Sequence, residues 1–455
     1  MELAPALITA LTETVNPDQA LSHLERLVSA YGAGNTLFQT LNAKPGLRNL
    51  ILKLCAGSEF LIGILVRNPG LLDWLTLPDV LLRERDEVEL EAELDRVLEG
   101  DWENDQQIAA LNDLRNRERL RIGTRDLLGL SDSFSTFEAL TLLAESILRR
   151  VYVAGYERMV DKWGWPRTER GEVCPFAILG LGKMGGRELT FGSDLDLVFV
   201  YSEDGRTDKG QGNLQFFVEL CQSIVNDFGK LTRNGSLYEI DARLRPEGGN
   251  ALLALSYDTY STYLKSRAKP WERLALSRAR MVAGNVGLGK RMLERFEQFV
   301  VGDGLNSRDL EEILDVRGRM EKKGRDTLSI KTHPGGIVDV EFLVQVLQIR
   351  HAQNHPGLRT PATREGLRLL GEAGLLDADS AAELDDNFVF LRTVEKVLRR
   401  QDEKGKTRLP KEGLALQAIA KAVSSEDGAA LIMDLKARMK VNRELFNRYI
   451  GKGSR

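Results

Sequence analysis

The sequence of 455 residues has little of what marks several common protein classes. Its three cysteines, Cys55, Cys174 and Cys221, match no zinc spacing and are odd in number, which favours buried thiols in a reducing cytoplasm. It has no excess of positive charge: the net charge is −4, whereas a general nucleic-acid binder is usually basic. The longest apolar stretch, residues 60–66, is too short to cross a bilayer, and residues 1–18 lack the basic flank and apolar core of a signal peptide. We therefore expect a cytoplasmic protein that binds neither nucleic acid nor membranes.

Most of the chain has the apolar periodicity of helices. Residues 17–30 place four apolar side chains on one stripe, with Pro17 in the first turn, where proline is favoured. The segment Ser135–Glu138 reads as a capping box, and we expect it to start a long helix that ends near Trp163.

The pattern changes after Pro175. Two short apolar runs, residues 176–182 and 194–201, predict buried strands, and residues 236–246 predict a third. A helix over residues 213–229 would connect the second strand to the third. We therefore predict a mostly α protein with a small α/β core at residues 135–285, a helical region at 1–134 and a helical bundle at 286–455.

The run GLGKMGGRELTFGSDLDLVFVY, residues 180–201, combines a glycine-rich turn with acidic residues at the start of a strand. Its glycines satisfy the G-x-G-x-x-G pattern of dinucleotide sites. That site needs a crossover helix before the next strand, and too few residues follow Gly186 here. A phosphate-binding P-loop is also excluded, because Met184 stands where serine or threonine is required.

The acidic residues suit a nucleotidyltransferase site. Side chains alternate along a strand, so Asp194 and Asp196 would share a face. Asp241 on the third strand would supply another carboxylate, with Glu239 on the same face. Close carboxylates repel each other, and Mg²⁺ prefers such oxygen ligands together with phosphate oxygens. We therefore expect two Mg²⁺ ions held by these acids in a two-metal phosphoryl-transfer site.

The neighbouring residues suit a triphosphate. Turn glycines let backbone N–H groups approach phosphate oxygens, a hydroxyl can donate to them, and basic side chains can balance their charge. These candidate nucleotide-binding residues are Gly182, Lys183, Gly185, Gly186, Ser193, Arg243 and Arg245. The plain alternative is a tight turn before a solvent-facing acidic strand, but it does not explain why acids interrupt an otherwise buried apolar run.

The motif G-x-G-K-x-G-G-x-E-L-x-x-x-S-D-x-D-L resembles that of the glutamine synthetase adenylyltransferases, members of the DNA-polymerase-β-like nucleotidyltransferase superfamily. Four further segments resemble the same family in the same order. They are GSEFLIGILVRNPGLLDWL (57–75), LYEIDARLRPEG (237–248), WERLALSRAR (271–280) and IKTHPGGIVDVEFLVQ (330–345). The resemblance thus covers nearly the whole chain.

The resemblance implies an activity. Members of this family carry two such halves: one attaches AMP from ATP to a tyrosine of glutamine synthetase, and the other removes it with phosphate, giving ADP. This sequence has one half. GSDLDLVF looks more like an adenylylating half, whereas GGRELTF and residues 390–410 look more like a de-adenylylating half, so the direction stays open. The implied partners are glutamine synthetase and a small nitrogen-signalling protein.

The resemblance also assigns residues. Asp194, Asp196 and Asp241 look like the metal-binding carboxylates, and Gly182, Lys183, Gly186 and Ser193 like the nucleotide loop. Asp339 and Glu341 look like family positions that either support the nucleotide pocket or form buried ion pairs with arginines such as Arg278 or Arg280.

Two rival functions remain at this point. One is another nucleotidyltransferase of the superfamily, acting on RNA or a small molecule. The other is a non-catalytic regulatory module that binds glutamine synthetase.

Overall fold

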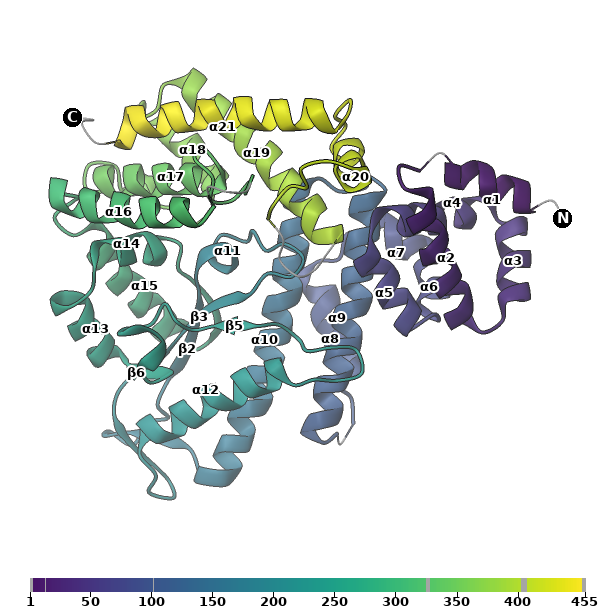
Figure 1. The fold of residues 1–455 in the computed structure, drawn as a ribbon. Coiled ribbons are helices and arrows are strands. Elements are labelled where there is room, and N and C mark those ends of the chain that lie inside the picture. Colours follow the sequence, from purple (N-terminus) through teal and green to yellow (C-terminus); the bar gives the residue numbers. More distant parts are fainter. Residues whose placement is uncertain (1–2, 13, 101, 325–327, 402–406, 452–455) are drawn as a thin grey trace.

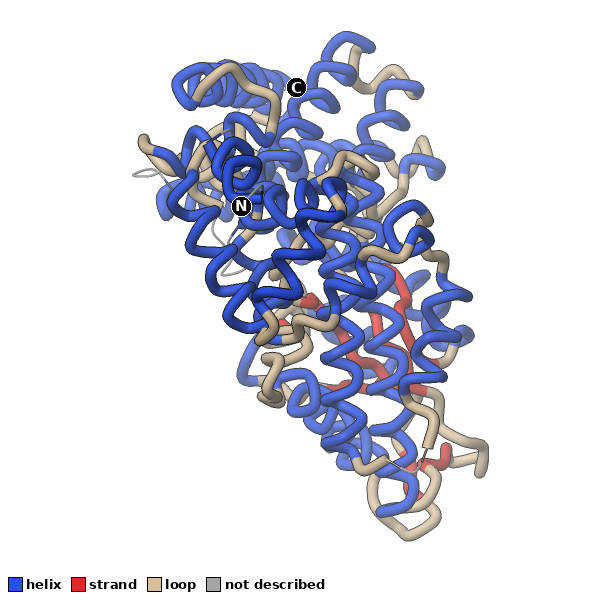
Figure 2. The backbone as a smooth tube through the Cα atoms, turned by 90° about the vertical axis from the view of Figure 1, so that its right-hand side faces the viewer, coloured by secondary structure: helices blue, strands red, loops and turns tan. Residues whose placement is uncertain are grey.

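A computed structural model describes residues 3–12, 14–100, 102–324, 328–401 and 407–451. Residues 402–406 of the 390–410 motif lie outside this described part. The fold is mostly helical, with a small sheet between helical regions, as predicted (Figure 1, Figure 2).

The N-terminal part consists of helices. They are α1 (Leu3–Thr12), α2 (Pro17–Tyr31), α3 (Gly34–Ala43), α4 (Pro45–Gly57), α5 (Glu59–Arg67), α6 (Leu71–Leu75), α7 (Pro78–Leu82), α8 (Glu87–Val97) and α9 (Asn104–Leu127). Helix α2 has Pro17 in its first turn as predicted, and the Asn16 side chain caps it by accepting from the Gln19 N–H.

No single described helix has the length and apolar character needed to span a membrane. Helices α4 and α5 would meet that test only together, but they bend by 119° at Ser58, and their apolar side chains, such as Leu54 and Leu61, are buried within the protein.

Helix α10 (Ser133–Trp163) ends where the sequence predicts but begins three residues earlier. Its cap is Asp132, whose carboxylate accepts from the N–H groups of Phe134 and Ser135. The predicted capping box at Ser135 is therefore wrong, because an aspartate three residues earlier already satisfies the free N–H groups of the first turn.

The central part contains the strands. They are β1 (Pro166–Thr168), β2 (Phe176–Gly180), β3 (Leu195–Tyr201), β4 (Gly205–Thr207), β5 (Ile240–Asp241), β6 (Ala254–Ser256) and β7 (Arg280–Gly284), with helices α11 (Gly182–Gly185), α12 (Asn213–Gly229), α13 (Tyr257–Ser266) and α14 (Pro270–Ser277) between them. The main sheet has the order β5-β3-β2-β7, and β6 also pairs with β3.

The predicted third strand is wrong in length. Residues 236–246 contribute only the two residues of β5, which pair in parallel with Leu195 and Asp196 of β3. The chain then turns, and the Arg245 guanidinium donates to the carbonyl oxygens of Ala242, Gly249 and Ala251. These bonds hold a loop where the alternating sequence suggested a strand.

The remaining chain forms a helical bundle. Its helices are α15 (Val286–Val301), α16 (Ser307–Gly324), α17 (Ile337–His351), α18 (Thr363–Glu372), α19 (Ala378–Gln401), α20 (Leu414–Ala422) and α21 (Gly428–Ile450).

The sheet separates two hydrophobic cores. On β3, Leu197 and Phe199 pack with the N-terminal helices, α10 and α12, whereas Val198 and Val200 pack with the C-terminal bundle. This is the alternation expected of a strand buried on both faces. The predicted division at 134 and 285 falls beside the starts of α10 and α15. This division into three parts stays a prediction. The N-terminal helices and one face of the sheet share a single hydrophobic core, so the core does not mark a boundary at residue 134.

Candidate functional site

Two of the three predicted carboxylates lie side by side. Asp196 on β3 is the register partner of Asp241 on β5. Asp194 directly precedes β3 and is exposed. By strand alternation Asp196 shares a face with Val198 and Val200, so the pair lies on the side of the sheet that meets the C-terminal bundle.

The two paired carboxylates differ electrostatically. Burial raises the pKa of Asp196 to about 6, and the negative charges of Asp241 and Asp194 add to the rise. Asp241 instead accepts hydrogen bonds of 2.9 Å from the backbone N–H and the Nε of Arg243, and this side-chain bond lowers its pKa. Asp196 therefore carries a negative charge that the protein itself leaves poorly compensated.

These residues fit Mg²⁺ in chemistry, because carboxylate oxygens are ligands that this ion prefers. Within the described ranges, however, no group of three His, Cys, Asp or Glu side chains is close enough to hold one ion. The Arg243 guanidinium is paired with the Asp241 carboxylate, and this pair would have to break before Asp241 could bind an ion. The two-ion site stays a prediction.

The glycine turn lies against Asp196 at one residue and against Arg278 at two others. Gly182 has φ +51°, and a Cβ atom there would lie 2.6 Å from Asp196 Oδ2. A Cβ on Gly185 would lie 1.7 Å from the Arg278 carbonyl oxygen, and one on Gly186 would lie 2.2 Å from the Arg278 guanidinium. All three glycines thus permit close approach, to a carboxylate in one case and to Arg278 in the others.

Lys183 is directed away from open solvent. Its Nζ donates to Glu395 Oε1 at 2.6 Å, and the two side chains are 14% and 0% exposed. Arg392 and Arg399 on α19 also pair with Glu395. Burial and the nearby cations together lower the pKa of Lys183 to about 7, although the negative charge of Glu395 opposes this shift. The contact of Lys183 with a triphosphate remains a prediction. In the structure, its ion pair with Glu395 connects the turn to α19.

The other predicted phosphate ligands hold local structure. The Ser193 hydroxyl accepts from the Thr190 N–H at 3.0 Å. Arg243 is exposed and pairs with Asp241, whereas the donors of Arg245 serve the 242–251 loop. Glu239 is exposed, and its carbonyl oxygen accepts from the Leu195 N–H.

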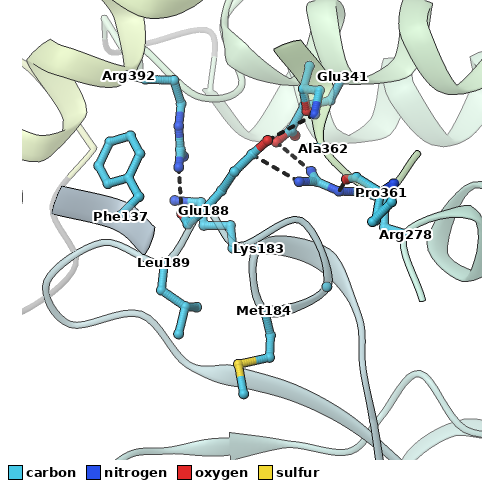
Figure 3. Close-up of polar contacts among 12 residues, drawn as sticks. Phe137, Lys183, Met184, Glu188, Leu189, Arg278, Glu341, Pro361, Ala362 and Arg392 are labelled. Carbon is cyan, nitrogen blue, oxygen red and sulfur yellow. Dashed lines mark hydrogen bonds and ion pairs between the residues drawn. The ribbon is translucent and has the colours of Figure 1, made fainter. Parts of the chain in front are cut away.

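Glu188 was not singled out from the sequence, yet it connects the turn to the bundle (Figure 3). Its carboxylate accepts from the Arg278 guanidinium and the Thr363 N–H, each at 2.9 Å. Its carbonyl oxygen accepts from Arg392 at 2.6 Å. The only signal in the sequence was its place as the E of GGRELTF.

Asp339 and Glu341, for which the sequence left two roles open, both form ion pairs. Glu341 pairs with Arg278 at 3.0 Å, one of the two arginines expected. Asp339 is fully buried and pairs with Arg317 and Arg443, so the expected partners are wrong there. The backbone reverses at Pro334–Gly336, and Asp339 accepts from the Gly335 N–H inside that turn.

Lys331 is a further residue that sequence reasoning missed. It belongs to the IKTHPGG segment and acts electrostatically on both Asp196 and Lys183. A cation from the bundle thus lies near the candidate carboxylates. Its place in the IKTHPGG segment was the only feature of the sequence that pointed to it.

Comparison with known proteins identifies the family. The model of glutamate–ammonia ligase adenylyltransferases matches residues 48–295, more than half of the chain. The chain belongs to this family. The model of GlnD PII-uridylyltransferases matches residues 310–450, the helical bundle.

Relatives of this family agree over most of the chain. Three of them are bifunctional glutamine synthetase adenylyltransferase/adenylyl-removing enzymes. The one from Thioalkalivibrio sulfidiphilus is 34% identical, and the match covers 85% of this chain and 41% of the relative. Those from Mesorhizobium japonicum and Shewanella woodyi are each 32% identical; the matches cover 88% and 86% of this chain and 40% and 43% of the relatives, respectively. The chain therefore spans about two fifths of the length of these adenylyltransferases.

Proposed function

We propose that this chain transfers AMP to or from a tyrosine of glutamine synthetase in a Mg²⁺-dependent reaction. In one direction the tyrosyl oxygen bonds to the α-phosphorus of ATP and pyrophosphate leaves. In the other, a phosphate oxygen bonds to the phosphorus of the tyrosyl-AMP, the tyrosyl oxygen leaves, and ADP forms. The observation that supports this best is the Asp196–Asp241 pair directly beside the Gly182 turn.

Each residue has a defined task in this proposal. Asp194, Asp196 and Asp241 would hold Mg²⁺, which supplies charge neutralisation for the phosphate oxygens. Gly182 lets the backbone of the turn come within contact of Asp196, so phosphates bound by the turn would lie beside the carboxylates. Arg243 is exposed and lies beside Asp241, so once released from that carboxylate it would be available to a phosphate.

The proposal extends to partners and place. The names of the relatives support glutamine synthetase as the target, and the match of the bundle to uridylyltransferases of PII supports a small nitrogen-signalling protein as regulator. We also propose a cytoplasmic location, which the three free and buried cysteines support.

A paired assay tests the function and its direction. One reaction contains unmodified glutamine synthetase and labelled ATP; the other contains AMP-tagged synthetase and phosphate. Each is run with and without Mg²⁺ and with the nitrogen-signalling protein. Label gained only in the first identifies an adenylylating chain, and ADP formed only in the second identifies a de-adenylylating chain. Silence of both with folded protein would refute the substrate and favour another nucleotidyltransferase or a binding module.

The carboxylate assignment has its own test. Asp194→Asn should lower the rate at least 100-fold, because a charged metal ligand becomes neutral. The protein should stay folded, because Asp194 is exposed. Asp379→Asn, which changes an exposed aspartate on α19, is the matched control and should keep full activity. An active Asp194→Asn enzyme would remove this residue from the metal site.

A further inference from the structure

A large cavity lies on the other side of α19 from the glycine turn. Its volume is about 1130 Å³, and its walls come from α4, the α9–α10 junction, α18, α19 and α20. None of the candidate carboxylates or turn glycines lines it. The cavity is therefore separate from the site described above, and it is large enough for a metabolite of nucleotide size or smaller.

Helix α19 presents two different faces to the two sites. Arg392, Glu395 and Arg399 contact Lys183 and the carbonyl oxygens of residues 188–192. One position further along, Thr393, Lys396 and Arg400 line the cavity. The spacing of three and four residues places each set on its own stripe of the helix.

The cavity wall contains buried positive charge. Lys396 and Arg400, 7% and 5% exposed, both pair with the single carboxylate of Asp126. Asp132, the other acid near Lys396, directs its oxygens to the N–H groups that begin α10. Lys396 and Arg400 thus share the carboxylate of Asp126, and the other two acids of the wall are Asp132 and the exposed Asp386.

Two donors of this wall lack partners. The Nε of Arg400 is buried and makes no hydrogen bond to any described residue. Lys53 on α4 lines the cavity, is exposed, and has no hydrogen-bond or ion-pair partner among the residues that the structure describes. Lys53 is therefore available to pair with an anion that enters the cavity.

We infer that this cavity binds a small organic anion, a carboxylate or phosphate ester, whose charged group contacts Lys53, Lys396 and Arg400. Phe134 and Val397 give the carbon part an apolar surface. Binding draws Lys396 and Arg400 toward the ligand. Because Arg392 and Arg399 lie on the same helix, the occupied cavity also changes nucleotide affinity at the turn. The binding step does not depend on the proposed reaction.

Calorimetry on the full chain tests the binding. Titration in EDTA without Mg²⁺ with succinate, and separately with inorganic phosphate, distinguishes a carboxylate from a phosphate site. We expect one of them to bind once per chain. Lys53→Gln should weaken it about tenfold, since one charge-assisted bond is lost. Lys290→Gln, at an exposed lysine on α15, should change nothing.

The same titration can overturn the inference. No binding of either anion at millimolar concentration, or equal affinity in wild type and Lys53→Gln, would refute the site. Lys396→Gln is a second variant, with thermal unfolding as its folding check, because Arg400 still pairs with Asp126 there. If it binds like wild type, the wall cations are not the ligands.

The coupling has a separate measurement. The Kd of Mg-ATP is determined with and without the bound anion, and by reciprocity each ligand must shift the other's affinity by the same factor. We expect a shift of about threefold or more in wild type at a saturating anion concentration. At an anion concentration that fills about half of the wild-type sites, the shift should be smaller in Lys53→Gln than in wild type, because fewer of its sites are occupied. An unchanged Kd in wild type would refute the coupling through α19, and it would do so whether or not glutamine synthetase is the substrate.

Discussion

At the scale of single residues, Gly182 is where the backbone of the turn and a candidate metal ligand occupy adjoining space. The sequence predicted a glycine there for phosphate binding, and the structure adds a steric requirement from Asp196. Such a contact could not be predicted from the sequence, because the two residues lie 14 positions apart on different elements.

Gly182→Ala should therefore displace the Asp196 carboxylate. The new methyl group would lie 2.6 Å from Asp196 Oδ2, and φ +51° adds backbone strain of about 1 kcal/mol. We expect activity to fall at least tenfold. Gly210→Ala is the matched control, because Gly210 has φ +87° but no atom within 4 Å of its Cβ position. Similar losses of activity in both variants would show that strain alone is responsible.

The motif predicted Lys183 as a nucleotide-binding residue, but the sequence could not predict that its side chain is buried. Three cations surround Glu395, and Lys183, with its pKa lowered to about 7, is the one that gives up a proton. Unfolding returns its pKa to about 10.5. Between pH 7 and 10.5 the unfolded chain thus binds more protons, so this residue makes stability rise with pH.

The check is urea unfolding of wild type and Lys183→Met from pH 7 to 9. Relative to the variant, wild type should gain up to about 1.4 kcal/mol per pH unit. Below pH 7 the difference should be constant, because both states then carry the proton. Parallel stability curves above pH 7 would mean that Lys183 keeps its charge in the folded protein.

At the scale of elements, the strands β2 and β3 and the helix α12 were predicted well, because period and apolar content are local signals. The third strand was predicted too long and the start of α10 too late. Both errors arise from side-chain contacts with the backbone, Arg245 with its loop and Asp132 with the first turn of α10. Helix α19 was expected as a helix, but its two arginine contacts with the 188–192 loop depend on tertiary packing.

Arg399 should act as a positioning residue through α19. Its guanidinium donates to the Gly192 carbonyl oxygen at 2.9 Å, just before Ser193 and Asp194. Arg399→Ala should lower kcat/KM by roughly 10-fold to 100-fold, the loss of one charged hydrogen bond. Hydrogen exchange of residues 188–194 should speed up in parallel.

Arg368→Ala is the control for this change. Among the residues that the structure describes, Arg368 pairs with Glu365 and Glu372 on the surface of α18, and such pairs contribute little. If Arg399→Ala lowers kcat/KM without faster exchange of the 188–194 amides, the arginine acts on the substrate and not on the loop.

At the scale of the whole molecule, the sequence divides into three parts, whereas the packing links them. Helix α9 bonds to the segment before β5, where Asn116 donates to the Asn234 carbonyl oxygen at 3.0 Å. Asp126, near the C-terminal end of α9, pairs with α19, and the Ser58 hydroxyl donates to the Arg400 carbonyl oxygen. Contacts of this kind join residues more than 100 positions apart, which local sequence patterns do not reveal.

We therefore expect one cooperative unfolding transition. Across a urea series, pulsed hydrogen exchange read by mass spectrometry should show peptides from α5, β3 and α19 losing protection at the same concentration. The physical reason is that the sheet borders both hydrophobic cores, so neither core can open while the other stays intact. Earlier loss of protection in α5 alone would instead show that residues 1–134 form an independent unit, as the sequence-based division predicts. The contacts of Asp126 and Ser58 with α19 would then be too weak to link the unfolding of that unit to the rest.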